Sequence, residues 1–115
     1  MHELSVMRNI LQIAVNFAEK QNAGEIIRIT VTAGTIVNIV PAYAKLFFKM
    51  IAKDTIAQNA VLDFNLVPAA IWCSACGEKT QFEVGNMLFT CPSCGSDGVQ
   101  LLSGRELRVE SIEII

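Results

Sequence analysis

The chain has 115 residues, of which 52% are hydrophobic and 17% charged, so we expect a folded domain with room for one small module. Its formal net charge of -2 disfavours nucleic acid and anionic lipid as partners, because both attract positive surfaces. No apolar run reaches the ~20 residues of a membrane helix, and Glu3 and Arg8 interrupt the early apolar residues, so we expect no membrane span and no signal peptide. We therefore expect a cytoplasmic protein, whose thiols stay reduced.

The first predicted element is an amphipathic helix, because apolar residues recur at helical spacing near the start of the chain. These residues are Leu4, Met7, Ile10, Leu11, Ala14, Phe17 and Ala18. Glu3 suits the first turn, where a negative charge complements the helix dipole, and Asn22-Ala23-Gly24 predicts the end of the helix. The next stretch, EIIRITVTAG, alternates β-branched and polar residues and predicts a strand that ends at Gly34.

The segment PAYAKLFFKMIAKDT (residues 41–55) predicts a second helix, with Pro41 in its first turn. Its helical spacing favours a buried side, although the same residues could instead form a partner surface: Phe47, Phe48, Met50 and Ile51. The stretch AVLDFNLVPA alternates again and predicts a strand that stops at Pro68. The final segment, ELRVESIEII, predicts a last strand, which we expect to join the sheet of the first half.

Cysteines, glycines and short polar turns dominate the segment between Ile71 and Gly104. We therefore predict an α+β fold in which two helices pack on a small, about three-stranded sheet, with an inserted four-cysteine module that resembles a zinc ribbon. Residues 1–70 plus 105–115 would form the α+β domain, and residues 71–104 the zinc-binding module.

Four cysteines occur as two CxxC pairs about fifteen residues apart, which is the pattern of a four-thiolate zinc site: Cys73, Cys76, Cys91 and Cys94. Two intervening residues let a tight turn aim both sulfurs at one ion, and Gly77 and Gly95 permit that turn. Disulfides would suit a secreted chain, and a redox site would need only one pair. An iron–sulfur cluster also accepts four cysteines, but the evenly paired turns favour zinc or a structural iron. Four thiolates leave no open position for water, so we expect a structural rather than a catalytic ion.

The only histidine of the chain is its second residue. We expect Met1 to be retained before so bulky a residue, so the terminus would offer its amine, the His2 imidazole and the backbone nitrogens of His2 and Glu3. Such a nitrogen set suits nickel(II) or copper(II) in planar geometry, and protons would displace the ion as the pH falls. The simpler alternative is that His2 is an ordinary exposed polar residue.

Several motifs together resemble the HypA/HybF family of nickel metallochaperones for [NiFe]-hydrogenase maturation: MHELSVM, CSACG, CPSCG, GRELRVESIEI and the intervening VTAGTIVNIVPAYAKLFFKMIAKDT. The resemblance covers essentially the whole chain. It implies that His2 is the principal nickel ligand with help from Glu3, and that the four cysteines hold structural zinc. The chain departs from many relatives at Val40-Pro41-Ala42, where they carry acidic residues.

The resemblance also implies partners: a HypB-type nickel GTPase and the [NiFe]-hydrogenase large subunit, with urease served in some members. Nickel would be transient cargo and zinc a resident ion. The high apolar content allows a homodimer, so we expect a monomer or a homodimer. The main alternative is a zinc-ribbon adaptor that binds nucleic acid or protein. A nucleic-acid ribbon would need basic residues near its cysteines, whereas Glu78, Glu83 and Asp97 stand there against only Lys79. We expect no enzymatic activity, because the sequence offers no set of nucleophile, base and phosphate loop.

Overall fold

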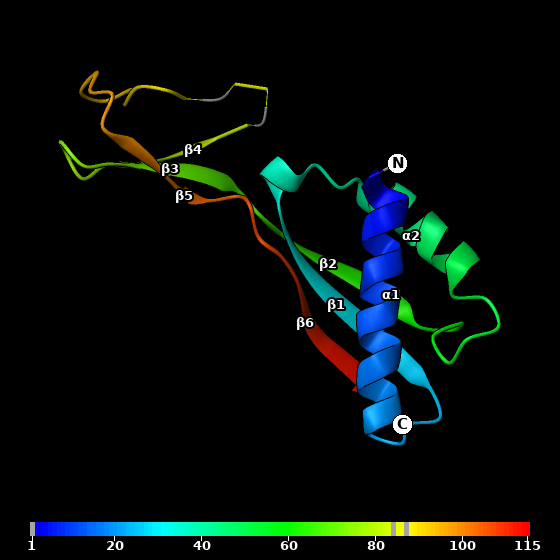
Figure 1. Ribbon diagram of the computed structural model, residues 1–115. Coiled ribbons are helices and arrows are strands. Elements are labelled where there is room, and N and C mark those ends of the chain that lie inside the picture. Colours follow the sequence, from blue (N-terminus) through cyan, green and yellow to red (C-terminus); the bar gives the residue numbers. More distant parts are fainter. Residues whose placement is uncertain (1, 84, 87) are drawn as a thin grey trace. The chain divides into compact units, whose positions relative to one another are not determined.

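The computed structural model describes residues 2–83, 85, 86 and 88–115 (Figure 1). The chain divides into two compact units, of which the first comprises the chain up to Thr32, Ile39–Asn65 and Arg108–Ile115. The second unit comprises Ala33–Asn38 and Leu66–Leu107. The sequence predicted other boundaries, with residues 1–70 and 105–115 in one domain and residues 71–104 in the other. Those two functional domains stay a prediction.

Helix α1 (His2–Lys20) begins two residues before the first apolar position of its pattern. Four side chains at spacings of three and four residues form its buried stripe: Met7, Ile10, Ala14 and Ala18. The helix ends where predicted, because Asn22 adopts a left-handed conformation and the N–H of Ala23 bonds to the carbonyl of Ala18. The same helix therefore carries the core of the first unit and the sequence's candidate nickel ligands.

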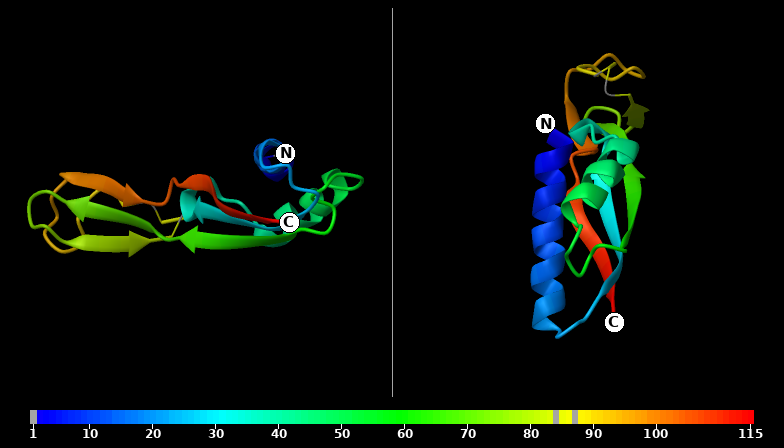
Figure 2. Two further views of the ribbon diagram at one scale, coloured as in Figure 1. Left: turned by 90° about the horizontal axis from the view of Figure 1, so that it is seen from below. Right: turned by 90° about the vertical axis from the view of Figure 1, so that its right-hand side faces the viewer.

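The three-stranded sheet of the first half has the order β2-β1-β6, with bounds β1 (Ile26–Gly34), β2 (Val61–Val67) and β6 (Leu107–Ile114). Backbone bonds between Ile115 and Glu25 and between Gly34 and Glu106 show that β1 and β6 run antiparallel. The arrows of β1 and β2 point the same way in Figure 2. The predicted sheet is confirmed, including the return of the last strand to it.

Helix α2 (Pro41–Ile51) connects these two parallel strands, as a crossover requires, and contacts α1 (Figure 1). Pro41 stands in its first turn as predicted, and Ala44 and Phe48 are buried against the core. The predicted burial of Met50 is wrong, because this side chain is 65% exposed. Apolar residues lie nearly all round this helix, so their spacing alone did not determine the buried side.

The second unit contains a separate antiparallel sheet of order β4-β3-β5, built from β3 (Ala69–Cys73), β4 (Lys79–Phe82) and β5 (Val99–Ser103). In the pairing of β3 with β4, Trp72 lies opposite Lys79, and in the pairing with β5, Cys73 lies opposite Val99. The register with β5 shifts between Ala70 and Ile71. The central strand therefore ends on the first cysteine, which fixes that sulfur to the sheet.

A close backbone approach also braces this unit. A Cβ placed on Gly34 would lie 2.0 Å from the carbonyl oxygen of Gly104, so only glycine fits there. The short 3-10 helix η1 (Thr35–Val37) follows, where the N–H of Ile36 donates to the same carbonyl and the hydroxyl of Thr35 accepts from the N–H of Ala69. Gly34 therefore permits the contact that joins residues 33–38 to the rest of the second unit.

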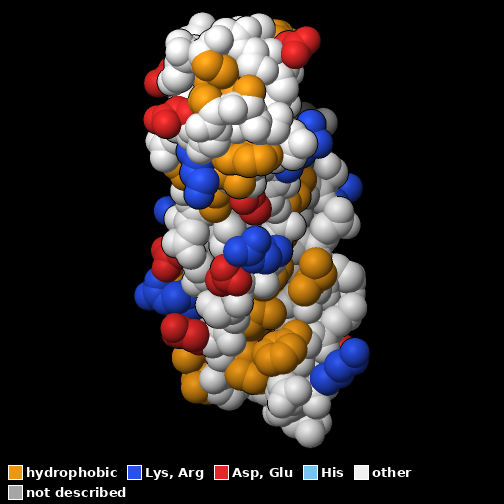
Figure 3. Space-filling view, turned by 90° about the vertical axis from the view of Figure 1, so that its left-hand side faces the viewer, with side chains coloured by type: hydrophobic (Ala, Val, Ile, Leu, Met, Phe, Trp, Pro, Cys, Tyr) orange, Lys and Arg blue, Asp and Glu red, His pale blue; other side chains and the backbone are white. Residues whose placement is uncertain are grey.

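Several charged side chains on the sheet of the first unit pair with a charge of the opposite sign. Arg28 on β1 pairs with Asp63 on β2, and Glu110 on β6 accepts hydrogen bonds from Arg108 and Thr32. Acidic and basic side chains also lie beside one another on the face shown in Figure 3. In the described part of the chain, none of the helices combines the length and the apolar character that a membrane span requires.

Candidate metal centres

The structure brings together all four cysteines that the sequence singles out. Their sulfur atoms all lie within 4.8 Å of one another, and two of the separations are 3.6 Å (Cys73 to Cys94) and 3.7 Å (Cys76 to Cys91). These thiols are free, and the distances are far longer than the ~2.0 Å of a disulfide bond. A tetrahedral zinc ion with ~2.3 Å bonds needs sulfurs about 3.8 Å apart, so the four sulfurs fit that ion.

Two turns of the same design aim the sulfurs. In the first, the N–H of Gly77 donates to the carbonyl of Cys73, and in the second the N–H of Gly95 donates to that of Cys91, both at 2.8 Å. Both glycines have φ near +76°, in the left-handed region that a side chain would disfavour. The predicted role of these two glycines is confirmed.

A hydrogen-bonded tie between the two turns was not anticipated from the sequence. The N–H and the hydroxyl of Ser74 both donate to the carbonyl of Gly98, and the N–H of Gly98 donates to the hydroxyl of Ser96. A Cβ on Gly98 would lie 2.8 Å from the Ser74 hydroxyl, so any larger residue would push that hydroxyl out of its present position in the tie. The only sequence signal for this tie was the polar, glycine-containing stretch that follows the second cysteine pair, Ser96-Asp97-Gly98.

The pKa values of the four thiols indicate why a cation would stabilise the cluster. A backbone hydrogen bond from Cys76 lowers the pKa of the Cys73 thiol to about 7 against the effect of desolvation, and one from Cys94 lowers the pKa of Cys91. A backbone hydrogen bond from Glu78 also lowers the pKa of the Cys76 thiol. Desolvation and the neighbouring thiols outweigh it and raise the pKa of Cys76 to about 12. Thiolates so close together repel one another, and a divalent cation removes that repulsion and displaces the remaining protons.

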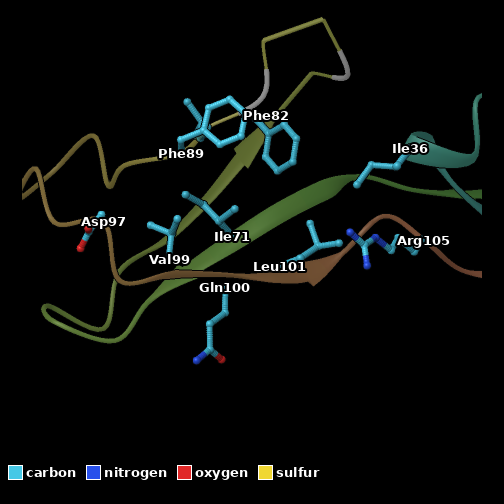
Figure 4. A pocket seen from close by; sticks show the side chains of 10 residues that line it. Ile36, Ile71, Phe82, Phe89, Asp97, Val99, Gln100, Leu101 and Arg105 are labelled. Carbon is cyan, nitrogen blue, oxygen red and sulfur yellow. The ribbon is translucent and has the colours of Figure 1, made fainter.

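The rest of the second unit has an open rather than a closed apolar interior. A hollow of about 330 Å³ lies on the face of the sheet that carries Ile71 and Val99, beside the rings of Phe82 and Phe89, and Gln100 points to the opposite side (Figure 4). Phe89 is 76% exposed. Because its apolar contacts are incomplete, this unit must derive much of its stability from the cysteine site.

The predicted nickel ligands lie in the first unit. His2 is the first residue of α1 and is exposed, and Glu3 follows in the first turn, while Met1 lies outside the described residues. The hydroxyl of Ser5 donates to the carbonyl of His2 at 3.0 Å. Among the described residues, the four cysteines are the only converging group of three or more His, Cys, Asp and Glu side chains.

Comparison with known proteins decides the family. The family model described as "Hydrogenase/urease nickel incorporation, metallochaperone, hypA" matches residues 1–114. The chain belongs to the HypA family. Its description is that of a metallochaperone, a protein that carries metal, rather than of an enzyme.

Individual HypA proteins agree with this assignment. The hydrogenase maturation factor HypA of Caldanaerobacter subterraneus is 36% identical over 115 residues, and that of Acidithiobacillus ferrooxidans is 34% identical over 114 residues; the alignments cover 99% of both chains in each case. The solution structure of the nickel metallochaperone HypA from Helicobacter pylori shares the fold, with a TM-score of 0.67 at 24% identity over 100% of this chain and 98% of that one. The predicted family and α+β fold are confirmed.

Proposed function

We propose that this HypA protein carries nickel(II) on its amino terminus and holds zinc in its four-cysteine site while it serves hydrogenase maturation. The Met1 amine, the His2 imidazole and the backbone nitrogens of His2 and Glu3 would bind the nickel. The observation that carries the proposal is the start of α1 at His2. The first N–H groups of a helix have no carbonyl partner within it, so the nitrogens of His2 and Glu3 can bind a metal without breaking a helical hydrogen bond.

Electrostatics make such a site weak enough to exchange its cargo. The amino-terminal end of a helix carries a partial positive charge, which opposes a cation, whereas the Glu3 carboxylate and the deprotonated amides would offset it. His2 is exposed, so incoming ligands can reach the ion. The cysteine site offers the opposite properties, because four thiolates complete a tetrahedral shell and two of the cysteines, Cys73 and Cys91, are buried.

Delivery would proceed by ligand exchange after docking to a HypB-type GTPase or to the hydrogenase large subunit, in the cytoplasm, where thiols stay reduced. Nitrogen ligands do not favour nickel over copper, since copper(II) binds such sets more tightly. Selectivity would therefore come from the metal available and from the partner. A zinc-ribbon adaptor for nucleic acid lacks support, because acidic Glu78 and Asp97 flank the cysteine turns.

Titration of nickel into zinc-loaded protein tests the proposal. Protein with Met1 as its free terminus should show a visible band of planar nickel, and the band should disappear in His2→Ala and in a variant with one residue inserted after Met1. His2→Ala should weaken nickel binding at least about tenfold while zinc content stays at one per chain. Retention of tight, one-to-one nickel binding by His2→Ala would move the site elsewhere and refute the proposal.

A further inference from the structure

Helix α2 exposes an apolar stripe that the core does not use. Tyr43, Leu46 and Met50 are 58%, 57% and 65% exposed, although each is a large hydrophobic side chain. Their spacing of three and four residues places them on one face over two helical turns. The buried residues Ala44 and Phe48 lie on another side of the same helix. Two distinct faces of α2 are therefore apolar, and only one of them packs inside the unit.

Two lysines run beside this stripe. Lys45 and Lys49 are one helical turn apart and both are exposed, and α2 contains no acidic residue. Among the described residues, neither ammonium group has a carboxylate within salt-bridge distance. The helix is therefore locally basic on a chain whose formal net charge is -2.

The lysines also border a hollow of about 390 Å³ between α2 and the start of β2. Gln58 and Asn59 line it on the far side, and the side-chain oxygen of Gln58 already accepts a bond from the N–H of Asp54. Ammonium and amide groups are donors that suit carboxylates. The same surface therefore carries apolar side chains next to ammonium and amide groups that can bind carboxylates.

We propose that this surface, the α2 face (Tyr43, Lys45, Leu46, Lys49 and Met50), docks an acidic amphipathic helix of a partner protein. An apolar stripe two turns long matches the i, i+3, i+7 anchors by which a helix packs against a helix. Glutamates or aspartates beside the partner's anchors would meet the two lysines and reach the hollow. The proposal concerns the α2 face alone and does not depend on where nickel binds.

Other occupants fit the charges less well. A second copy using the same patch would bring four lysines together without a carboxylate, because isologous interfaces pair one patch with itself. An anionic membrane usually selects clusters of four or more basic residues, whereas the α2 face has two on an acidic chain. Charge complementarity therefore favours an acidic protein helix.

A pair of synthetic peptides provides the test. Both are helices of about 15 residues with leucine at i, i+3 and i+7, and they differ only in glutamate or lysine at the flanking positions. Nuclear magnetic resonance of ¹⁵N-labelled full-length protein should show amide shifts over residues 43–50 and 58–59 with the glutamate peptide. This peptide should bind at least about tenfold more tightly than the lysine peptide at low salt.

Surface variants locate the contact. Lys45→Glu with Lys49→Glu should lower affinity for the glutamate peptide about tenfold, and Leu46→Ser should abolish the shifts, whereas Lys79→Glu on β4 should change neither. These side chains are exposed, so an unchanged spectrum of the free variants shows that they fold. Equal binding of both peptides, shifts confined to other residues, self-association removed by Leu46→Ser, or binding of phosphatidylserine vesicles in place of the peptide would each overturn the proposal.

Discussion

The two units of this HypA protein are stabilised in different ways. The first has a closed apolar core from α1, α2 and β1, with Met7, Ile29 and Val31 fully buried. The second has short strands, an open apolar hollow and a set of four converging sulfurs held by paired turns. The first unit can therefore fold on its apolar core, whereas the second depends more on an ion held by its cysteines. Under the proposed function, the terminus of the first unit is then free to exchange nickel.

Removal of the zinc should produce the largest effect and should separate the two units. Cys73→Ser should lower the affinity for zinc more than about a hundredfold, and a strong chelator should remove the ion from the unaltered protein. Either treatment should unfold the second unit, because the stability of this unit depends on the ion. Amide resonances of 66–83 and 88–107 should collapse, while those of α1 should persist. Ser93→Ala, next to a ligand but not one, is the matched control. Unfolding of both units together would show that the first unit also depends on zinc for its stability.

A cavity in the apolar core should instead destabilise the first unit. Phe48 is 3% exposed, so Phe48→Ala should lower the free energy of unfolding by about 3–5 kcal/mol, measured by urea denaturation. Met50→Ala on the same helix is the control and should cost no more than about 0.5 kcal/mol, because Met50 is exposed. Zinc content should be unchanged in both. Equal effects of the two substitutions would show that the exposed and buried faces of α2 are wrongly assigned.

The smallest effect should come from the charges on β6. Hydrogen bonds from Arg108 and then Thr32 hold the pKa of Glu110 below its ordinary value. A lowered pKa adds stability that is present above the ordinary carboxyl pKa and is lost as the pH falls through the lowered one. Glu110→Gln should therefore unfold at a slightly lower urea concentration than the parent at pH 7, and the difference should vanish near pH 3. A difference that persisted at pH 3 would assign the effect to packing.

Sequence periodicity predicted most of the first unit. Local signals predicted helix α1, strand β1 and the position of Pro41, and the structure confirms these elements. Burial departs from the predicted pattern at three positions, because Thr32 is buried whereas Ile27 and Phe17 are exposed. The buried side of α2 was not predictable in this way, because an almost wholly apolar helix gives no preferred face. Tertiary contacts decide that Phe48 is buried and Met50 exposed.

The second unit shows the opposite pattern. Its metal-type cluster was predictable from CxxC spacing, but its sheet was not, because strands of four or five residues are too short to display an alternation. The approach of Gly34 to Gly104 joins residues seventy positions apart, so no local window could reveal it. The start of α1 at His2 was likewise two residues earlier than the apolar pattern indicated.

X-ray absorption on one sample loaded with both metals would identify the ligands of nickel and of zinc separately. At the zinc edge, we expect four sulfur neighbours at about 2.3 Å. At the nickel edge, we expect nitrogen neighbours only, including an imidazole that is lost in His2→Ala. Sulfur in the nickel shell, or nitrogen in the zinc shell, would show that the two metals share ligands and would contradict the division between an exchanging terminus and a permanent cysteine site.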